Sequence, residues 1–193
     1  LFNGLCRYDT VTYEPVPSLA ESWETSEDGL TWTFYLRQDV KWHDGTPFTA
    51  EDVKFSADTF LSDGYRGNRY IGNVTSTEVV DDYIVIFNMS QPFPAFTTYL
   101  VSRFMIVPKH LLEGTDIQNN IEFNRNNPIG TGAYKMVENN PGESIILEAN
   151  EDYFLGAPNI DRIIFKIIPD ANTQIAQMMT GELDLVELEP YDV

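Results

Sequence analysis

A strict alternation of polar and apolar residues after a turn at residues 27–29 restricts most strongly how this chain can fold. Trp32, Phe34 and Leu36 occupy every second position, so they share one face of a β-strand. The acidic turn with its glycine separates this strand from residues 19–24, which are expected to form its hairpin partner. We expect these aromatic residues to pack in the core of a small sheet rather than to stack on a ligand.

A helix is expected to begin after Thr49, whose hydroxyl can accept a backbone N–H, with Glu51 and Asp52 in the first turn. Its apolar residues recur at helical spacing, which predicts a helix over residues 50–61 with one buried stripe. Residues 63–73 follow and are rich in Gly, Asn, Tyr and Arg. Surface loops of this kind often contact ligands.

The C-terminal third has the order strand, helix, strand. Residues 160–169 carry large apolar side chains on both faces, which is typical of a central strand covered on two sides. A helix over residues 172–180, ended by Gly181, and a strand beginning at residues 184–188 should follow. This order predicts an α/β layer, and the polar residues 124–127 before it are the expected boundary between two units. The other expected elements are hairpins at 75–89 and 133–149, a short helix at 95–100, an extended segment at 105–107 and a helical turn stopped by Gly114.

Charge and residue counts exclude several classes of function. The chain has 30 Asp and Glu against 12 Lys and Arg, a net charge of -18, so we expect it to bind neither nucleic acid nor anionic lipid. Cys6 has no second thiol with which to form a disulfide or a zinc site, and a buried thiol is expected. His43 and His110 are far apart and belong to no metal-ligand or catalytic pattern, so we expect no catalytic residue, metal or cofactor.

Several sequence motifs follow one another along nearly the whole chain. They are LAESW at 19–23, SEDGLTWTF at 26–34, VKWHDGTPFTAEDV at 40–53, PIGTGAY at 128–134, NEDY at 150–153 with GAP at 156–158, and GELD at 181–184. In this order they closely resemble the family 5 extracellular solute-binding proteins. That family includes the oligopeptide-, dipeptide- and nickel-binding components of ABC importers.

The resemblance implies a mixed α/β fold of the periplasmic-binding-protein class II type, with two lobes that close on a ligand by hinge motion. Family members are well over twice as long as this chain, so the resemblance implies a fragment without the second lobe. By this comparison residues 1–14 begin lobe I, residues 15–123 are a small domain inserted into it, and residues 124–193 continue lobe I.

The same resemblance points to ligand-cleft residues in the loop after the first long helix and in the segment after the Pro-aromatic run at 91–94. Matching those segments selects Arg103, Arg69 and Tyr70, with Tyr65 as an additional candidate. An arginine in a cleft suits a carboxylate, such as a peptide C-terminus or a metal chelator, through its paired N–H donors. A surface arginine that pairs with nearby acids is the alternative interpretation.

The resemblance implies a monomeric, non-enzymatic receptor that captures a peptide or peptide-like solute outside the cytoplasmic membrane and delivers it to an ABC permease. The signal and anchor segments are expected to lie outside this chain. Capture of a nickel chelate, an oligosaccharide or haem by the same fold is the alternative ligand class. Rivals of another class are a hydrolase that uses two of the many acids, and a sensory or chaperone-like module that has borrowed the fold.

Overall fold

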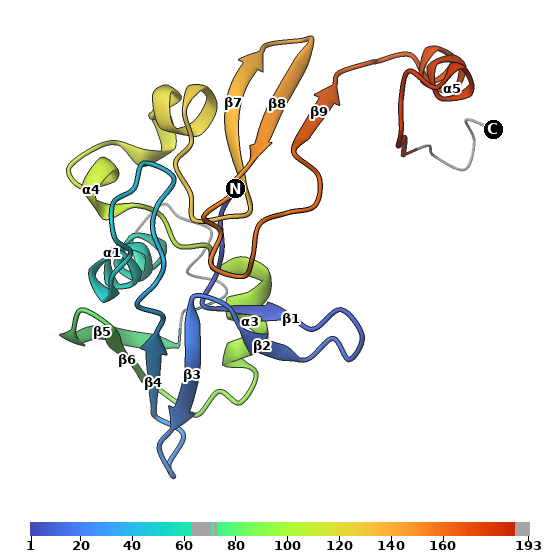
Figure 1. Ribbon diagram of the computed structural model, residues 1–193. Coiled ribbons are helices and arrows are strands. Elements are labelled where there is room, and N and C mark those ends of the chain that lie inside the picture. The colour runs from blue at the N-terminus through green and yellow to red at the C-terminus, as the bar shows by residue number, and fades with distance from the viewer. Residues whose placement is uncertain (63–70, 72, 188–193) are drawn as a thin grey trace.

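The computed structural model describes residues 1–62, 71 and 73–187 of the chain. The helices and strands are β1 (Cys6–Tyr8), β2 (Pro15–Pro17), β3 (Ala20–Thr25), β4 (Thr31–Leu36), α1 (Ala50–Leu61), β5 (Val74–Asp81), β6 (Ile84–Met89), α3 (Phe96–Arg103), α4 (Lys109–Leu112), η1 (Ile117–Asn119), η2 (Glu122–Asn126), β7 (Tyr134–Asn140), β8 (Ser144–Ala149), β9 (Arg162–Lys166) and α5 (Ala171–Thr180). This mixed α/β content agrees with the expected fold class. Figure 1 shows the sheet of strands β3–β6 apart from the sheet of strands β7–β9, with the N-terminal segment running between them, and β1 and β2 pair with each other in a sheet of their own.

The larger sheet is antiparallel, with the strand order β3-β4-β6-β5. The predicted alternation in β4 is present, because Trp32, Phe34 and Leu36 are buried while the residues between them are partly exposed. Phe34 and Phe87 both contact Phe96 of α3, at ring-centroid distances of 6.3 Å and 5.4 Å. Burying a side chain of this size contributes about 1.5–3 kcal/mol, so the aromatic face holds α3 against the sheet.

Helix α1 occupies the predicted residues and packs against β5 and β6. Its third residue, Asp52, accepts the N–H of Thr49 at 3.0 Å, which is the carboxylate half of a capping box. Of the apolar residues predicted to form one stripe, Val53 and Ala57 are buried, whereas Phe60 is partly buried.

The second sheet is antiparallel, with the order β7-β8-β9, and it follows the segment at residues 128–132. The N-terminal residues 1–5 connect it to the rest of the molecule. The N–H of Gly132 donates to the Leu1 carbonyl oxygen at 2.7 Å, and the N–H of Ile106 donates to the Asn3 carbonyl oxygen at 3.1 Å. The extended N-terminal segment therefore lies between the chain after α3 and the chain before β7.

Two predictions for the C-terminal third were wrong for the described residues. Residues 160–169 were expected to form a central strand, but β9 pairs only with β8, and Ile164 and Phe165 are 52% and 54% exposed. Residues 184–187 of the expected last strand form no strand, and Leu185 is 87% exposed. A strand requires a hydrogen-bonding neighbour, and no described strand lies beside this segment, which follows α5 where that helix stands away from the sheet (Figure 1).

Residues 124–127 were expected to be a polar boundary between two units, but most of them belong to the π-helical turn η2. The side chain of Asn120 accepts the N–H of Phe123 at 3.0 Å, and the buried Phe123 ring packs on Phe2 at 5.9 Å. A packed helical turn is more rigid than a polar linker. The domain boundaries at residues 15 and 124 stay predictions.

Candidate functional site

Arg103 ends α3, and it is the predicted ligand residue that the structure describes. The residue is exposed, and a cation in the last turn of a helix is stabilised by the negative end of the helix dipole. The next residue, Phe104, is buried and packs edge-on against Phe60 at 5.3 Å between ring centroids. Phe60 belongs to the last turn of α1, so the C-terminal ends of α1 and α3 meet beside Arg103.

The other predicted ligand residues, Tyr65, Arg69 and Tyr70, lie outside the described residues. The chain is described on both sides of them, at Ser62 after α1 and at Ile71, which is buried. The contact between Phe60 and Phe104 places the end of α1, which precedes the predicted ligand loop in the sequence, against the residue that follows Arg103. Whether these four side chains share one cleft stays a prediction.

Aromatic side chains border the exposed side of α3. Tyr99 is 37% exposed and packs on Phe93 at 5.2 Å, and the hydroxyl of Tyr8 donates to the Thr98 carbonyl oxygen at 3.4 Å. Tyrosine offers an apolar ring together with a polar tip, which suits contact with a partly polar solute. The sequence pattern alone did not single out Tyr8 or Tyr99, because each stands in an ordinary strand or helix.

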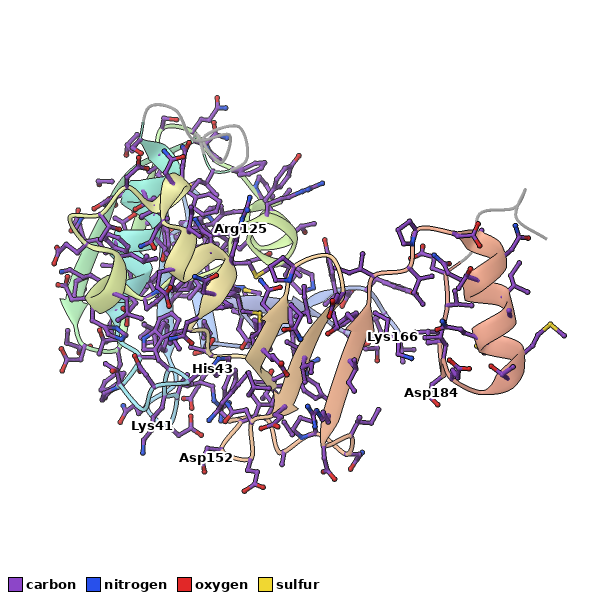
Figure 2. All side chains as sticks on the ribbon, turned by 90° about the horizontal axis from the view of Figure 1, so that it is seen from above. Lys41, His43, Arg125, Asp152, Lys166 and Asp184 are labelled. Atoms are coloured by element: carbon purple, nitrogen blue, oxygen red, sulfur yellow. The ribbon has the colours of Figure 1, made fainter. Side chains whose placement is uncertain are left out.

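A second cluster joins the two sheets and is built from residues of the recognised motifs. His43 contacts Gly130 and Gly132 through its backbone and its ring. Thr131 donates to Asn3 Oδ1 at 3.1 Å, and Asn150 Nδ2 donates to the Gly132 carbonyl oxygen at 3.2 Å. Figure 2 shows His43 at the border between the part of the chain with β3–β6 and the β7–β9 sheet.

The glycines at 130 and 132 are required by space. A Cβ on Gly132 would lie 2.6 Å from the Leu1 carbonyl oxygen, and one on Gly130 would overlap the same oxygen. The backbone of the glycine pair therefore approaches the N-terminal segment more closely than any side chain would allow. Asn150 belongs to the NEDY motif, but no pattern singled out Asn3, because an isolated asparagine is usually a turn residue.

Buried polar groups hold the turn at residues 41–47 in place. Asp52 accepts hydrogen bonds from the indole of Trp42 at 3.2 Å and from the N–H of Lys109 at 2.9 Å. Burial raises the pKa of Asp52 above its usual range, although the hydrogen bonds from Lys109, Thr49 and Trp42 oppose this shift. These partners lie 10 and 57 residues away in the sequence, so the carboxylate joins the turn, α1 and α4.

The ion pair between His110 and Asp44 fastens α4 to the same turn, with Nε2 and Oδ2 2.7 Å apart. Burial favours a higher pKa for Asp44, but hydrogen bonds from His110 and Thr46 outweigh it and leave the pKa below its usual range. Both histidines thus contact partners within the fold. Among the described residues, no group of three or more His, Cys, Asp or Glu is arranged to hold a metal ion.

A groove of about 540 Å³ lies over the β7–β9 sheet. Its walls are mainly apolar, with Phe2, Met136, Leu147 and Phe165 among them, and Arg125 contributes a charge at its margin. Asn124 and Asn139 add amide groups to the same lining. Within the described part of the chain, no helix has the length and apolar character needed to cross a bilayer.

Comparison with known sequences identifies the family. The profile of the bacterial extracellular solute-binding proteins, family 5 Middle, matches residues 14–193. The chain belongs to this family. The oligopeptide-binding protein AppA of Bacillus subtilis is 38% identical over 180 residues, which are 91% of this chain and 33% of that protein. The dipeptide-binding protein of Escherichia coli is 32% identical over 211 residues, covering 99% of this chain and 39% of that protein.

Solved family 5 structures have the same fold. AppA of Bacillus subtilis in complex with a nonapeptide superimposes with a TM-score of 0.88 at 37% identity, covering 95% of this chain and 37% of that one. NikZ from Campylobacter jejuni in complex with Ni(L-His) also gives a TM-score of 0.88 at 37% identity, covering 95% and 36%. The chain thus spans a little over a third of the length of these relatives.

Proposed function

We propose that this chain is the first-lobe part of a receptor that captures a peptide or peptide-like solute outside the cytoplasmic membrane and delivers it to an ABC permease. The observation that carries the proposal is the family match over residues 14–193, together with a fold like that of AppA in complex with a nonapeptide. Residues 15–123 are the small inserted domain and residues 124–193 continue lobe I. The second lobe lies outside these 193 residues.

The ligand residues in this proposal are Arg103, Arg69, Tyr70 and Tyr65. Arg103 is supported by its exposure at the end of α3 and by the contact between Phe60 and Phe104 beside it. A guanidinium presents paired N–H donors that match the geometry of a carboxylate. On a chain with a net charge of -18, most other surface regions repel a carboxylate ligand, so a cationic cleft provides selectivity.

Binding without chemistry is the proposed activity. The receptor acts as a monomer, and selectivity arises from hydrogen bonds and charge pairing in a cleft from which lobe closure excludes water. Support comes from the relatives' descriptions as binding proteins and from the internal roles of His43 and His110. A hydrolase that uses two acids would instead show turnover that an Asp or Glu substitution abolishes.

A nickel chelate is the second candidate ligand, because NikZ in complex with Ni(L-His) is as similar to this chain as AppA is. Calorimetry on the intact protein distinguishes the two. Peptides with free C-termini, the same peptides with amidated C-termini, and Ni²⁺ with L-histidine form the ligand panel. Binding of free-carboxylate peptides alone supports the peptide receptor, and saturable binding of nickel with histidine alone supports the alternative. No binding to either class contradicts the proposed function.

The site assignment is tested by Arg103→Gln in the intact protein, with Arg162→Gln on β9 as the matched control. Loss of a charged hydrogen-bonding partner costs about 1.5–3 kcal/mol, which is about a 10- to 150-fold weaker affinity. The control substitution removes the same charge from another exposed position and should leave affinity within about twofold. Equal affinities for both variants would remove Arg103 from the site without contradicting the receptor function.

The two-lobe arrangement has its own test. Because the proposed cleft needs both lobes, the 193-residue chain alone should bind the solute poorly or not at all. Calorimetry on this chain beside the intact protein measures the difference. Equal affinity for one solute in both would show that the site is complete within these residues.

A further inference from the structure

His43 is held by three hydrogen bonds to one short segment. Its backbone N–H donates to the Gly130 carbonyl oxygen at 2.8 Å, its Nδ1 accepts the N–H of Gly130 at 3.2 Å, and its Nε2 lies 2.9 Å from the Gly132 carbonyl oxygen. A backbone N–H can only donate and a carbonyl oxygen can only accept. The imidazole is therefore neutral, with its proton on Nε2 and the lone pair of Nδ1 toward Gly130.

These bonds join the two parts of the fold. His43 belongs to the turn closed by pairing of Lys41 with Pro47, which leads into α1, whereas Gly130 and Gly132 lead into β7. The two residues of the ring contact are 87 positions apart in the sequence. Figure 2 shows His43 beside the sheet of β7–β9, and the residue is half-buried. The imidazole thus acts as a connection between units and not only as part of one core.

A second proton would break one of the three hydrogen bonds in this connection. Protonated imidazole donates from both nitrogens, so Nδ1–H would point at the N–H of Gly130, and two donors cannot share that 3.2 Å contact. The carbonyl oxygen of Gly132 would keep its donor, but it also accepts from Asn150 at 3.2 Å and would remain satisfied if the ring left. Protonation therefore removes the acceptor of the Gly130 N–H, and the backbone bond from His43 to Gly130 is the contact that does not depend on the charge of the ring.

The charges around the ring support the neutral form. Burial lowers the pKa of His43, and the hydrogen bond to Gly132 opposes this shift. Of the charged side chains that face it, Lys135 of β7 lowers the pKa further, while Asp44 raises it. Asp44 is already engaged by His110 at 2.7 Å, which limits its help to a charged His43.

We propose that His43 is an acid-sensitive latch, closed when its imidazole is neutral and opened by protonation of Nδ1, which loosens the turn at 41–47 from the segment at 130–132. This inference concerns the junction and goes beyond the proposed ligand function. The latch is fully closed above the pKa of an unconstrained histidine, about 6.5. As the pH falls below that value the open state gains protons that the closed state does not, so opening is favoured about tenfold per pH unit until the pKa of the closed state is reached.

Nitrogen-15 NMR of the imidazole tests the closed state directly in the intact protein. At pH 7.5 we expect His43 to carry its proton on Nε2, with Nδ1 unprotonated and hydrogen-bonded. The titration midpoint should lie below about 6.5, because the closed latch resists protonation. A proton on Nδ1 at neutral pH, or a midpoint at or above 6.5, would overturn the proposal, and neither result depends on a variant that must fold.

Hydrogen exchange at the Gly130 amide tests the opening. We expect its protection factor to fall about five- to tenfold per pH unit below 6.5 in the natural protein. His43→Gln supplies an amide with one acceptor and one donor but no titration, so its protection factor should be independent of pH in this range. His110→Gln is the matched control, since it removes the histidine of α4 that contacts the same turn, and it should keep the fall.

The protection factors of the three proteins can either support or refute the latch. A fall in the natural protein and in His110→Gln, but not in His43→Gln, supports the latch. An equal fall in all three proteins, or no fall in the natural protein, would refute it.

Discussion

Replacing Asp52 by alanine would remove the acceptor on which three separate segments converge. The carboxylate is 5% exposed and accepts the N–H of Thr49 at 3.0 Å, the N–H of Lys109 at 2.9 Å and the indole N–H of Trp42 at 3.2 Å. Alanine leaves all three donors without a partner and fills none of the space. Asparagine keeps the shape but turns an amide nitrogen toward one of the donors.

The expected cost follows from these contacts. A buried donor left without an acceptor costs about 1–3 kcal/mol, and loss of a helix-capping side chain costs about 0.5–2 kcal/mol. Water can reach Thr49 and Lys109, which are partly exposed, but Trp42 is 2% exposed and its indole would stay unsatisfied. We expect Asp52→Ala to lower the free energy of unfolding by about 3–5 kcal/mol, and Asp52→Asn by about 1–3 kcal/mol.

Urea unfolding followed by tryptophan fluorescence measures this difference, because Trp23, Trp32 and Trp42 all lie in the affected unit. Glu51→Ala is the matched control, since Glu51 is the neighbouring acid and pairs with Lys109 at 2.9 Å on the surface. An exposed pair of this kind contributes about 0–1 kcal/mol. The reasoning fails if Asp52→Ala unfolds within 1 kcal/mol of the natural protein, or if the control costs as much.

Three further outcomes are expected. Tyr13 has φ of 58°, a left-handed conformation that favours glycine, and its side chain is 75% exposed. Tyr13→Gly should therefore raise the free energy of unfolding by about 0.5–1 kcal/mol in urea unfolding. A lower free energy of unfolding would reveal a stabilising role for the ring. Gly130→Ala should lower the free energy of unfolding by about 1–3 kcal/mol or more in the same assay, because its Cβ would overlap the Leu1 carbonyl oxygen. Unchanged stability would show that the N-terminal segment can move away. Burial raises the pKa of Cys6 to about 12. Thiol reagents at pH 8 should therefore label it at least about 100-fold more slowly in the folded protein than in urea. Comparable labelling rates would contradict a buried thiol.

Local chemistry explains which elements could be predicted from sequence. The alternation through Trp32, Phe34 and Leu36 determines which face of β4 is buried whatever lies against it, and Thr49 with Asp52 marks the start of α1. The turn at Asp28 and Gly29 depends on residues next to one another, and it forms as expected with φ of 70° at the glycine. Such features depend on neighbours within a few positions.

The remaining features depend on contacts that sequence patterns do not encode. The bonds from Asp52 to Lys109 and from His43 to Gly130 join residues 57 and 87 positions apart. The apolar residues on both faces of β9 predicted a central strand. Such a pattern shows that a strand can be buried on both sides, but it does not show which segments cover it. Arg103 was selected by resemblance, and its exposure at the end of α3 is consistent with a ligand role without identifying the ligand.

The roles of the motif residues explain why family membership leaves the solute open. Trp42, His43 and Asp44 each contact a different segment, namely α1 through Asp52, the chain before β7, and α4 through His110. Each of these contacts lies within the fold, so none of the three side chains identifies a solute. NikZ in complex with Ni(L-His) and AppA in complex with a nonapeptide share the same 37% identity with this chain, so overall identity does not distinguish the two kinds of ligand. If the proposed function holds, substitutions outside this junction, such as at the end of α3, should change the ligand without unfolding the protein.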